Sequence, residues 1–213
     1  VFEEKDVISI VAATRKAGEF FRKIKYKMNS VKDVMVVGGG EIGHYLCEQL
    51  IRSGMSVKLI EKDPARCETL CATLDDGVAV INGDASDQNI LVESGLEQTG
   101  AFVALTNLDE ENILLSLFAK SVCDCKCVTK INRIGFDNVI SKLDLDTIIN
   151  PKSITSDTIV RYVRAMSSSR GSNMETLYNV IKGKVEAAEF IIKEDSPVID
   201  VPLMELDLKP DVL

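Results

Sequence analysis

The chain of 213 residues contains no tryptophan, one histidine (His44) and five prolines. A single histidine excludes multi-histidine metal sites and histidine-based proton relays. No apolar run reaches the roughly 18–20 residues of a membrane-spanning helix, and no signal-peptide pattern is present. Basic residues are scarce too, because 25 Lys and Arg against 33 Asp and Glu give a net charge of −8. This balance argues against a dedicated DNA- or RNA-binding protein.

Apolar residues, in contrast, make up 46% of the chain, which is enough for a folded core and excludes wholesale disorder. The length predicts one or two domains. The chain does not begin with Met and stops soon after a proline-containing segment, so we interpret it as an excised fragment. Six cysteines in a chain of this size without a secretion signal are expected to be reduced thiols. They are Cys47, Cys67, Cys71, Cys123, Cys125 and Cys127.

Between residues 33 and 150, short apolar segments rich in β-branched residues alternate with helical patterns. The segments lie too close to intervening helices for hairpins, which predicts βαβ units. The fold class that follows is α/β, with a doubly wound, right-handed parallel sheet of about six strands (Rossmann-like). The expected strands are 33–38, 56–61, 78–82, 101–105, 127–131 and 147–149. The expected helices include 88–94, 112–121 and 136–143, and one that Asp63 and Pro64 open.

The flanking segments have a different character. Residues 7–12 predict a strand and 14–28 a basic helix with a phenylalanine patch. That helix suits either an anionic membrane surface or a solvated connection, and the pattern is too short to separate the two. Residues 156–167 predict a helix, followed by a flexible linker and an extended stretch at 185–193. We therefore expect three parts, namely 1–30, 31–170 and 171–213.

A glycine-rich loop follows the first expected strand and opens the first expected helix. The six residues from Gly38 to Gly43 match G-x-G-x-x-G, a motif that binds a dinucleotide in this context. Its glycines permit a tight turn, close approach of a pyrophosphate and close helix packing, while the helix N-terminus offers free N–H groups.

Glu61 ends the second strand, where a carboxylate binds the adenosine ribose and favours NAD over NADP. Lys62 and Arg66 soften that preference.

Further polar residues end the third, fourth and fifth strands, at the edge where doubly wound sheets bind ligands. Asp84, Thr106 and Asn107 suit either ligand contact or capping and turn roles. Lys130 is placed to neutralise a phosphate or to pair with Glu61.

Cys123, Cys125 and Cys127 alternate along the chain. Thiolate metal sites use C-x₂₋₄-C pairs with a distant second pair, so this spacing favours ordinary thiols over a metal site. We assign His44, on the first turn of the helix after the glycine loop, no catalytic role.

Several of these motifs together resemble the RCK (KTN, or TrkA-N) domain family of potassium channels and Trk/Ktr-type transporters. The resemblance covers residues 31–170 and is strongest to the TrkA regulatory subunits of Trk potassium uptake systems. Residues 185–213 resemble the start of the TrkA-C domain that follows, and residues 4–10 the end of a preceding one, apart from Lys5 where the family has Gly. This order suggests the middle of a tandem-repeat subunit. The motifs that carry the resemblance are 34–43, 61–63, 83–85, 104–112 and 145–151.

The resemblance implies a cytosolic, non-enzymatic NAD(H)-binding regulatory domain that controls a potassium transporter or channel. It implies a membrane potassium transporter subunit as partner, a homo-oligomer of RCK domains, and a place on the inner face of the cell membrane. NAD or NADH is the implied ligand, with ATP or ADP as alternatives at the same site. The family often has Arg where Lys130 stands. The implied contacts are Gly38, Gly39, Gly40, Glu41, Ile42, Gly43, Glu61, Asp84, Thr106, Asn107 and Lys130.

Two other functions stay open. A fragment of an NAD-dependent dehydrogenase would have the same loop, but it needs an acid or base near the nicotinamide and a substrate-holding segment. No Tyr-x-x-x-Lys pair is present on a helix to supply them. A protein-interaction module with a vestigial nucleotide site would have the same sequence.

Overall fold

The computed structural model describes residues 14–24, 31–133, 137–140, 142–168, 174–181, 185–190, 192, 194, 196, 198–202 and 205. The chain forms two compact units, Met28–Ile154 and a second that combines Val1–Lys27 with Thr155–Leu213. The expected strand at 7–12 and the family-like segment at 4–10 lie outside the described residues. The three-part division into 1–30, 31–170 and 171–213 stays a prediction.

Within the described part of the chain, we find no helix with the length and apolar character needed to cross a membrane.

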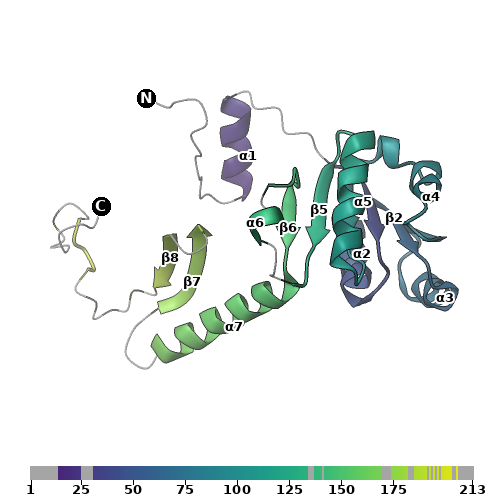
Figure 1. Ribbon diagram of the computed structural model, residues 1–213. Helices are drawn as coiled ribbons and strands as arrows, with labels where there is room; N and C mark the ends of the chain where they lie inside the picture. The colour runs from purple at the N-terminus through teal and green to yellow at the C-terminus, as the bar shows by residue number, and fades with distance from the viewer. Residues whose placement is uncertain are drawn as a thin grey trace. The chain divides into compact units, whose positions relative to one another are not determined.

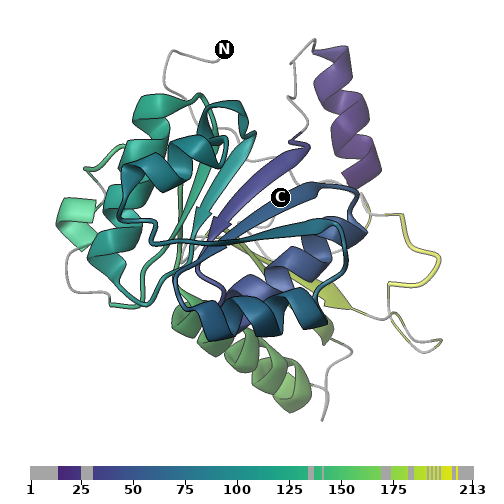
Figure 2. The same ribbon diagram turned by 90° about the vertical axis from the view of Figure 1, so that its right-hand side faces the viewer.

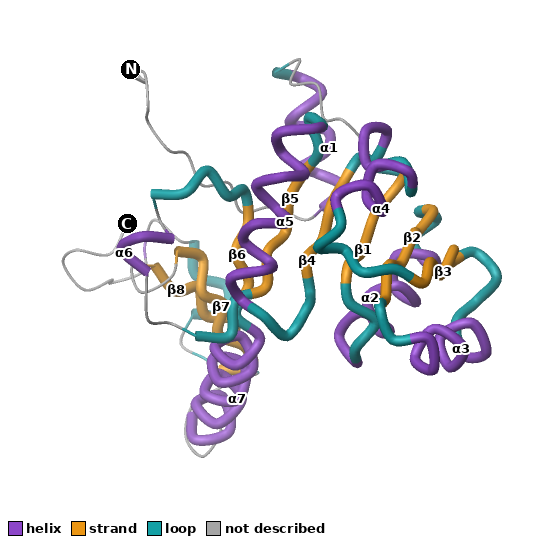
Figure 3. Tube along the Cα trace, turned by 45° about the vertical axis from the view of Figure 1, so that its right-hand side comes forward, coloured by secondary structure: helices purple, strands orange, loops and turns teal. Residues whose placement is uncertain are grey.

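A six-stranded sheet forms the centre of the unit Met28–Ile154. Every strand pair in it is parallel, and the order β3-β2-β1-β4-β5-β6 can be followed across Figure 3. The prediction of a Rossmann-like α/β sheet is therefore confirmed. The strands are β1 (Asp33–Val37), β2 (Ser56–Glu61), β3 (Val78–Asn82), β4 (Ala101–Ala104), β5 (Lys126–Lys130) and β6 (Thr147–Ile149).

Helices cover both faces of this sheet (Figure 2). One face carries α2 (Glu41–Arg52) and α3 (Pro64–Thr73), and the other carries α4 (Gln88–Glu93) and α5 (Asp109–Val122). A 3₁₀ turn at Leu96–Gln98 leads into β4. The chain thus winds outward from β1 in one direction and then from β4 in the other. This reversal between adjacent strands creates a crevice at their carboxyl ends.

Each face of the sheet has its own apolar core. On the α4 and α5 side, Met35, Phe102 and Leu91 are completely buried. On the α2 and α3 side, Leu59 and Leu70 are equally inaccessible. Since β1 contributes to both cores, it appears in the sequence as a continuous apolar run rather than an alternating one.

Two helices begin earlier than expected, for reasons visible at their N-termini. Helix α5 starts at Asp109 rather than at 112, because its first turn carries three carboxylates that the positive end of a helix favours. Helix α7 (Pro151–Ser168) starts five residues before the expected 156. The side chain of Asn150 accepts a hydrogen bond of 2.9 Å from the N–H of Ser153, which caps this helix.

The second unit contains α1 (Thr14–Lys23), most of α7 and a hairpin (Figure 1). The expected basic helix at 14–28 is described as helical to Lys23, and residues 25–28 lie outside the described part. The expected stretch at 185–193 contains β8 (Val185–Phe190). Its antiparallel partner β7 (Met174–Ile181) was missed, because a serine-rich run before it indicates a linker. The short helix α6 (Asp137–Ile140) belongs to the sheet-containing unit.

Asp146 stabilises the β5–β6 side of the sheet. Its carboxylate accepts hydrogen bonds from the N–H of Cys127 and the ammonium of Lys120, both at 2.9 Å. The hydrogen bond from Cys127 is the main cause that lowers the pKa of Asp146, and Lys120 acts in the same direction. A carboxylate with a lowered pKa in the folded state stabilises the fold above its unfolded pKa and loses that effect as the pH falls.

We therefore expect Asp146→Asn to lower the free energy of unfolding by about 1–2 kcal/mol at neutral pH. Asp144 is the matched control, since it also pairs with Lys120, at 3.1 Å, but its side chain is 92% exposed. Asp144→Asn should change the free energy by less than about 1 kcal/mol. Urea titrations from pH 7 downward should show the Asp146→Asn deficit shrinking below about pH 4. A deficit that is constant with pH would contradict this assignment.

Candidate nucleotide site

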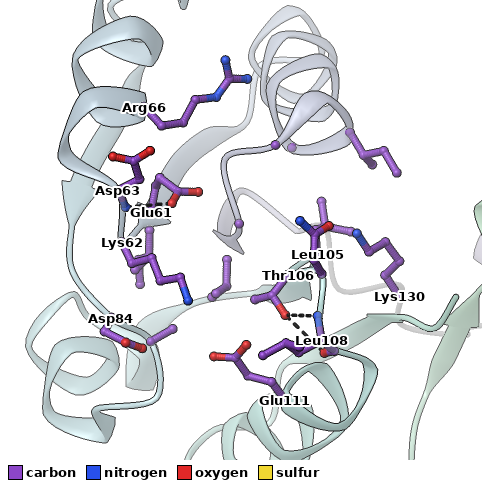
Figure 4. Close-up of a pocket in the computed structure, with 18 of the residues that line it drawn as sticks. Glu61, Lys62, Asp63, Arg66, Asp84, Leu105, Thr106, Leu108, Glu111 and Lys130 are labelled. Atoms are coloured by element: carbon purple, nitrogen blue, oxygen red, sulfur yellow. Dashed lines mark hydrogen bonds between the residues drawn. The ribbon is translucent and has the colours of Figure 1, made fainter.

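A pocket of about 720 Å³ opens at the carboxyl end of the parallel sheet (Figure 4). Segments that follow β1, β2, β3 and β4, together with the end of β5, form its wall. The pocket brings together ten of the eleven residues named from the sequence. These are Gly38, Gly40, Glu41, Ile42, Gly43, Glu61, Asp84, Thr106, Asn107 and Lys130. Gly39 does not line it and is buried, and a Cβ there would lie 2.5 Å from the side chain of Leu70.

Gly38 and Gly43 make the turn between β1 and α2 possible. Gly38 has φ +103°, and a Cβ on it would lie 2.9 Å from the carbonyl carbon of Leu105. A Cβ on Gly43 would lie 2.1 Å from the carbonyl oxygen of Gly38. Both contacts are with backbone, which cannot move aside. The chain therefore passes from strand to helix with no room for a side chain at either position.

Gly40 differs because it faces open space. A Cβ built on it would meet nothing within 4 Å, and Gly40 lines the pocket. It also stands at the N-cap of α2, where no side chain caps the helix. The N–H groups of the first turn of α2 are thus left without a side-chain acceptor at the pocket. An uncapped helix N-terminus of this kind suits an anion.

Glu61 holds the glycine loop to the end of β2. Its Oε2 accepts a hydrogen bond of 2.7 Å from the N–H of Gly39, and its Oε1 accepts one of 2.9 Å from the N–H of Asp63. Each carboxylate oxygen has a second lone pair, so both can accept one more hydrogen bond. The half-buried carboxylate therefore lines the pocket in a fixed orientation.

The guanidinium of Arg66 on α3 contacts two residues of the glycine loop. Its Nε donates to the carbonyl oxygen of Gly39 at 2.7 Å, and its terminal nitrogen lies 3.5 Å from Glu41. The guanidinium thus braces the glycine loop from the α3 side. Lys62 also lines the pocket, next to Glu61 in sequence.

Asn112 is a residue that the sequence did not single out. Its side chain is completely buried and joins two strand ends. Oδ1 accepts hydrogen bonds of 2.8 Å from both the N–H and the hydroxyl of Thr106, and Nδ2 donates to the carbonyl oxygens of Thr106 and Lys130. The hydroxyl of Thr106 is therefore used to shape the loop after β4, which is the turn role that the sequence left open. An asparagine on a helix gives no such signal by itself.

Lys130 is a buried cation at the pocket wall, with 5% of its surface exposed. Burial lowers the pKa of its ammonium, and the charge of Asp109 partly opposes this. Asp109 itself is bonded to the N–H groups of Asn132 and Arg133, at 2.8 and 2.9 Å. Among the ion pairs of the described residues none involves Lys130, so the suggested pairing with Glu61 is wrong. Glu61 bonds backbone N–H groups instead.

Two further carboxylates line the pocket. Asp84 follows β3, and hydrogen bonds from Ser86 hold its pKa below the usual value, with Lys62 acting in the same direction. Glu111, on the first turn of α5, was not predicted as a site residue. In Figure 4 it lies below Thr106, on the side toward Asp84.

The cysteine cluster lies apart from the pocket. The structure pairs Cys123 with Cys125 as a disulfide, so the expectation that all six thiols are reduced is wrong for these two. The bend between α5 and β5 brings their Cα atoms to 5.3 Å, within the usual range for a disulfide. No group of three or more His, Cys, Asp or Glu that could hold a metal occurs in the described ranges.

The TrkA-N domain family model matches residues 34–151, which include all of the pocket-lining segments. The chain belongs to the TrkA-N domain family. The resemblance found in the sequence is thus confirmed.

Curated relatives of this TrkA-N chain are also similar beyond that domain. "Trk system potassium uptake protein TrkA" of Haemophilus influenzae is 31% identical over 196 residues, which are 90% of this chain and 42% of the relative. The protein with the same description from Halomonas elongata is 31% identical over 211 residues, or 98% of this chain and 44% of that protein. The chain therefore spans less than half the length of these relatives.

Solved structures are similar to this chain in fold. The TrkA-N domain of the inner membrane protein ybaL from Escherichia coli has a TM-score of 0.56 at 18% identity, and covers 64% of this chain and 99% of that one. The GsuK channel has a TM-score of 0.56 at 18% identity, over 67% of this chain and 25% of the channel chain. An NAD(P)-binding domain of an exopolyphosphatase-related protein from Archaeoglobus fulgidus has a TM-score of 0.55 at 17% identity, over 64% of this chain and 100% of that domain.

Gly43→Ala and Gly40→Ala distinguish the glycine that the tight turn requires from the glycine that faces the open pocket. Gly43→Ala should lower the free energy of unfolding by about 3 kcal/mol or more, because its methyl group overlaps the backbone of Gly38. Gly40→Ala meets no neighbour and should change it by less than about 1 kcal/mol. Urea denaturation of both variants measures the difference. Equal losses in the two variants would show that the turn adjusts freely.

Proposed function

We propose that this chain is an NAD(H)-binding regulatory domain of a potassium transport system. The observation that carries the proposal is Glu61, fixed by two backbone N–H groups beside the uncapped N-terminus of α2. A carboxylate and an anion-binding helix end in one pocket fit the two halves of a nucleotide diphosphate. Membership of the TrkA-N family supports the same ligand class.

Each part of the pocket has a distinct task in this proposal. The free lone pairs of Glu61 accept hydrogen bonds from the ribose hydroxyls of adenosine. The N–H groups of Gly40, Glu41 and Ile42 bind the diphosphate, which approaches closely because Gly40 has no side chain. Lys130, buried and without an ion-pair partner among the described residues, supplies positive charge three strands away from Glu61.

The same carboxylate favours NAD(H) over NADP(H). A 2′-phosphate would lie against the negative charge of Glu61, which repels it. Of the two nearby cations that could relieve this repulsion, Arg66 is held by Gly39 and Glu41, which leaves Lys62. ATP and ADP also have two free ribose hydroxyls, so the proposal admits them at the same site.

Regulation would act through a membrane subunit. The relatives in Haemophilus influenzae and Halomonas elongata are described as potassium uptake proteins, so we propose a membrane potassium transporter subunit as partner, with this chain on the cytoplasmic face.

We also propose a homo-oligomer, packed through α7, whose Ile159, Val160 and Val163 are each about half exposed. The sequence places Met166 on the same apolar face of this helix, but its side chain lies outside the described part. A nucleotide biases such an assembly only by binding its two states unequally.

The proposed domain is not an enzyme, and turnover distinguishes it from a dehydrogenase fragment. His44 does not line the pocket, and its Nε2 lies 3.5 Å from Glu48 on the same helix. The pocket therefore has no histidine acid or base to exchange a proton with a substrate. Consumption of NADH with common carbonyl substrates would favour the dehydrogenase.

Glu61→Gln tests the ribose contact. We expect it to weaken NADH binding by about 1–3 kcal/mol, because a neutral amide forms weaker hydrogen bonds than a carboxylate. Glu68→Gln is the matched control, since Glu68 is exposed on α3 and does not line the pocket. Isothermal calorimetry with the full chain measures both. If Glu61→Gln bound NADH as tightly as the control, the ribose contact would be elsewhere.

Lys130→Met tests the phosphate contact. Loss of the buried positive charge should weaken binding of NADH and ATP by about 1–3 kcal/mol, whereas Lys130→Arg should retain most of the affinity. Lys126→Met, at an exposed position of the same strand, controls for net charge and should bind like the original chain. Equal affinities for Lys130→Met and Lys126→Met would remove Lys130 from the site.

A further inference from the structure

Cys123, Cys125 and Cys127 form a sulfur cluster that the proposed nucleotide site does not use. The cluster lies where α5 ends and β5 begins. In a parallel sheet this is the amino end of the strand, opposite the carboxyl ends at which the pocket opens. None of the three cysteines lines the pocket. The cluster therefore has no role in binding the nucleotide directly.

We propose that Cys123 and Cys125 are a reversible redox modification site, whose thiols low-molecular-weight disulfides such as oxidised glutathione convert to the Cys123–Cys125 disulfide. The structure joins these two sulfurs and leaves Cys127 as a free thiol beside them. This proposal is independent of the nucleotide.

The same surroundings accommodate the reduced pair. The sulfur of Cys123 lies 3.3 Å from the carbonyl oxygen of Ala119, which is in place to accept a hydrogen bond from its thiol. The sulfur of Cys125 lies 3.9 Å from that of Cys127, so its thiol also has a neighbour. Reduction therefore leaves neither thiol without an acceptor. Reduction must let the two sulfurs move apart, and these neighbours lie within reach of the separated thiols.

The three sulfurs differ in access. Cys123 is half-buried, Cys125 is 6% exposed and Cys127 is completely buried. An oxidant in solution therefore reaches Cys123 first. The thiolate of Cys123 attacks the oxidised glutathione, forms a mixed disulfide and releases one glutathione. The thiolate of Cys125 then attacks the Cys123 sulfur and displaces the second glutathione. The two thiol protons end on the two released glutathione molecules, which take up two electrons.

Cys127 does not compete for Cys125, although it is close. Its thiol lies 3.6 Å from the carbonyl oxygen of Ser116, inside the core against α5. Burial, with the charge of Asp146 as a smaller cause, raises the pKa of Cys127 to about 11. Because only the thiolate attacks a disulfide, Cys127 stays unreactive at neutral pH. It is therefore an internal control for the reactive pair.

Tryptic mapping of the full chain tests the proposal, because cleavage after Lys120 and Lys126 isolates the two cysteines on one peptide and leaves Cys127 on the next. The folded chain is incubated with oxidised glutathione or with dithiothreitol, quenched with N-ethylmaleimide, unfolded with excess N-ethylmaleimide present and digested. After dithiothreitol, peptide 121–126 should carry two maleimides. After oxidised glutathione, it should carry none and have lost two hydrogens, while Cys127 still carries maleimide. Dithiothreitol added afterwards should restore labelling of the pair.

Three results would overturn the proposal. The first is peptide 121–126 with two maleimides after oxidation, and the second is glutathione retained on Cys123. The third is a cross-link between this peptide and that of Cys127. Cys125→Ser should trap the mixed disulfide on Cys123, and Cys127→Ser should oxidise like the original chain. If a variant fails to fold, the peptide map of the original chain still distinguishes these outcomes.

Discussion

The carboxylate of Glu61 is the constraint on which the pocket depends. It accepts hydrogen bonds from Gly39 in the loop after β1 and from Asp63 in the turn after β2. Two chain segments that are separate in sequence thereby acquire a fixed spacing at the carboxyl end of the sheet. Arg66 reinforces this spacing from α3 through the carbonyl oxygen of Gly39. The side chain that is proposed to recognise a ribose is therefore also the one that shapes the loop beside it.

The other half of the pocket is built differently, from buried side chains that bond backbone. Asn112 connects the loop after β4 with the end of β5, and Asp109 connects the start of α5 with the residues after β5. These contacts fix the backbone at Lys130 and just after it, while the ammonium of Lys130 has no hydrogen-bonded partner among the described residues. A buried charge of this kind costs free energy unless an anion accompanies it. In the proposed function, the anionic diphosphate would offset this cost.

The fold was largely predictable because buried parallel strands are continuous apolar runs, and because Asp63–Pro64 and the glycine loop are explicit boundary signals. The position of Glu61 was predictable for a similar reason, since its distance from the glycines is set by one helix and one strand. The role of the Thr106 hydroxyl in shaping the loop after β4 was not predictable. It depends on a hydrogen bond to Asn112, which only the folded chain brings near. The strand Met174–Ile181 was missed since its pairing with β8 is a tertiary contact that follows a linker-like run.

Asn112 also has a consequence for which substitutions the fold can accept. Its side-chain amide accepts two hydrogen bonds at Oδ1 and donates two at Nδ2. Aspartate has the same shape, but it would turn the donating side into a second oxygen facing two carbonyl oxygens in a dry interior. Asn112→Asp would therefore destabilise the fold, although the volume of the side chain is nearly unchanged.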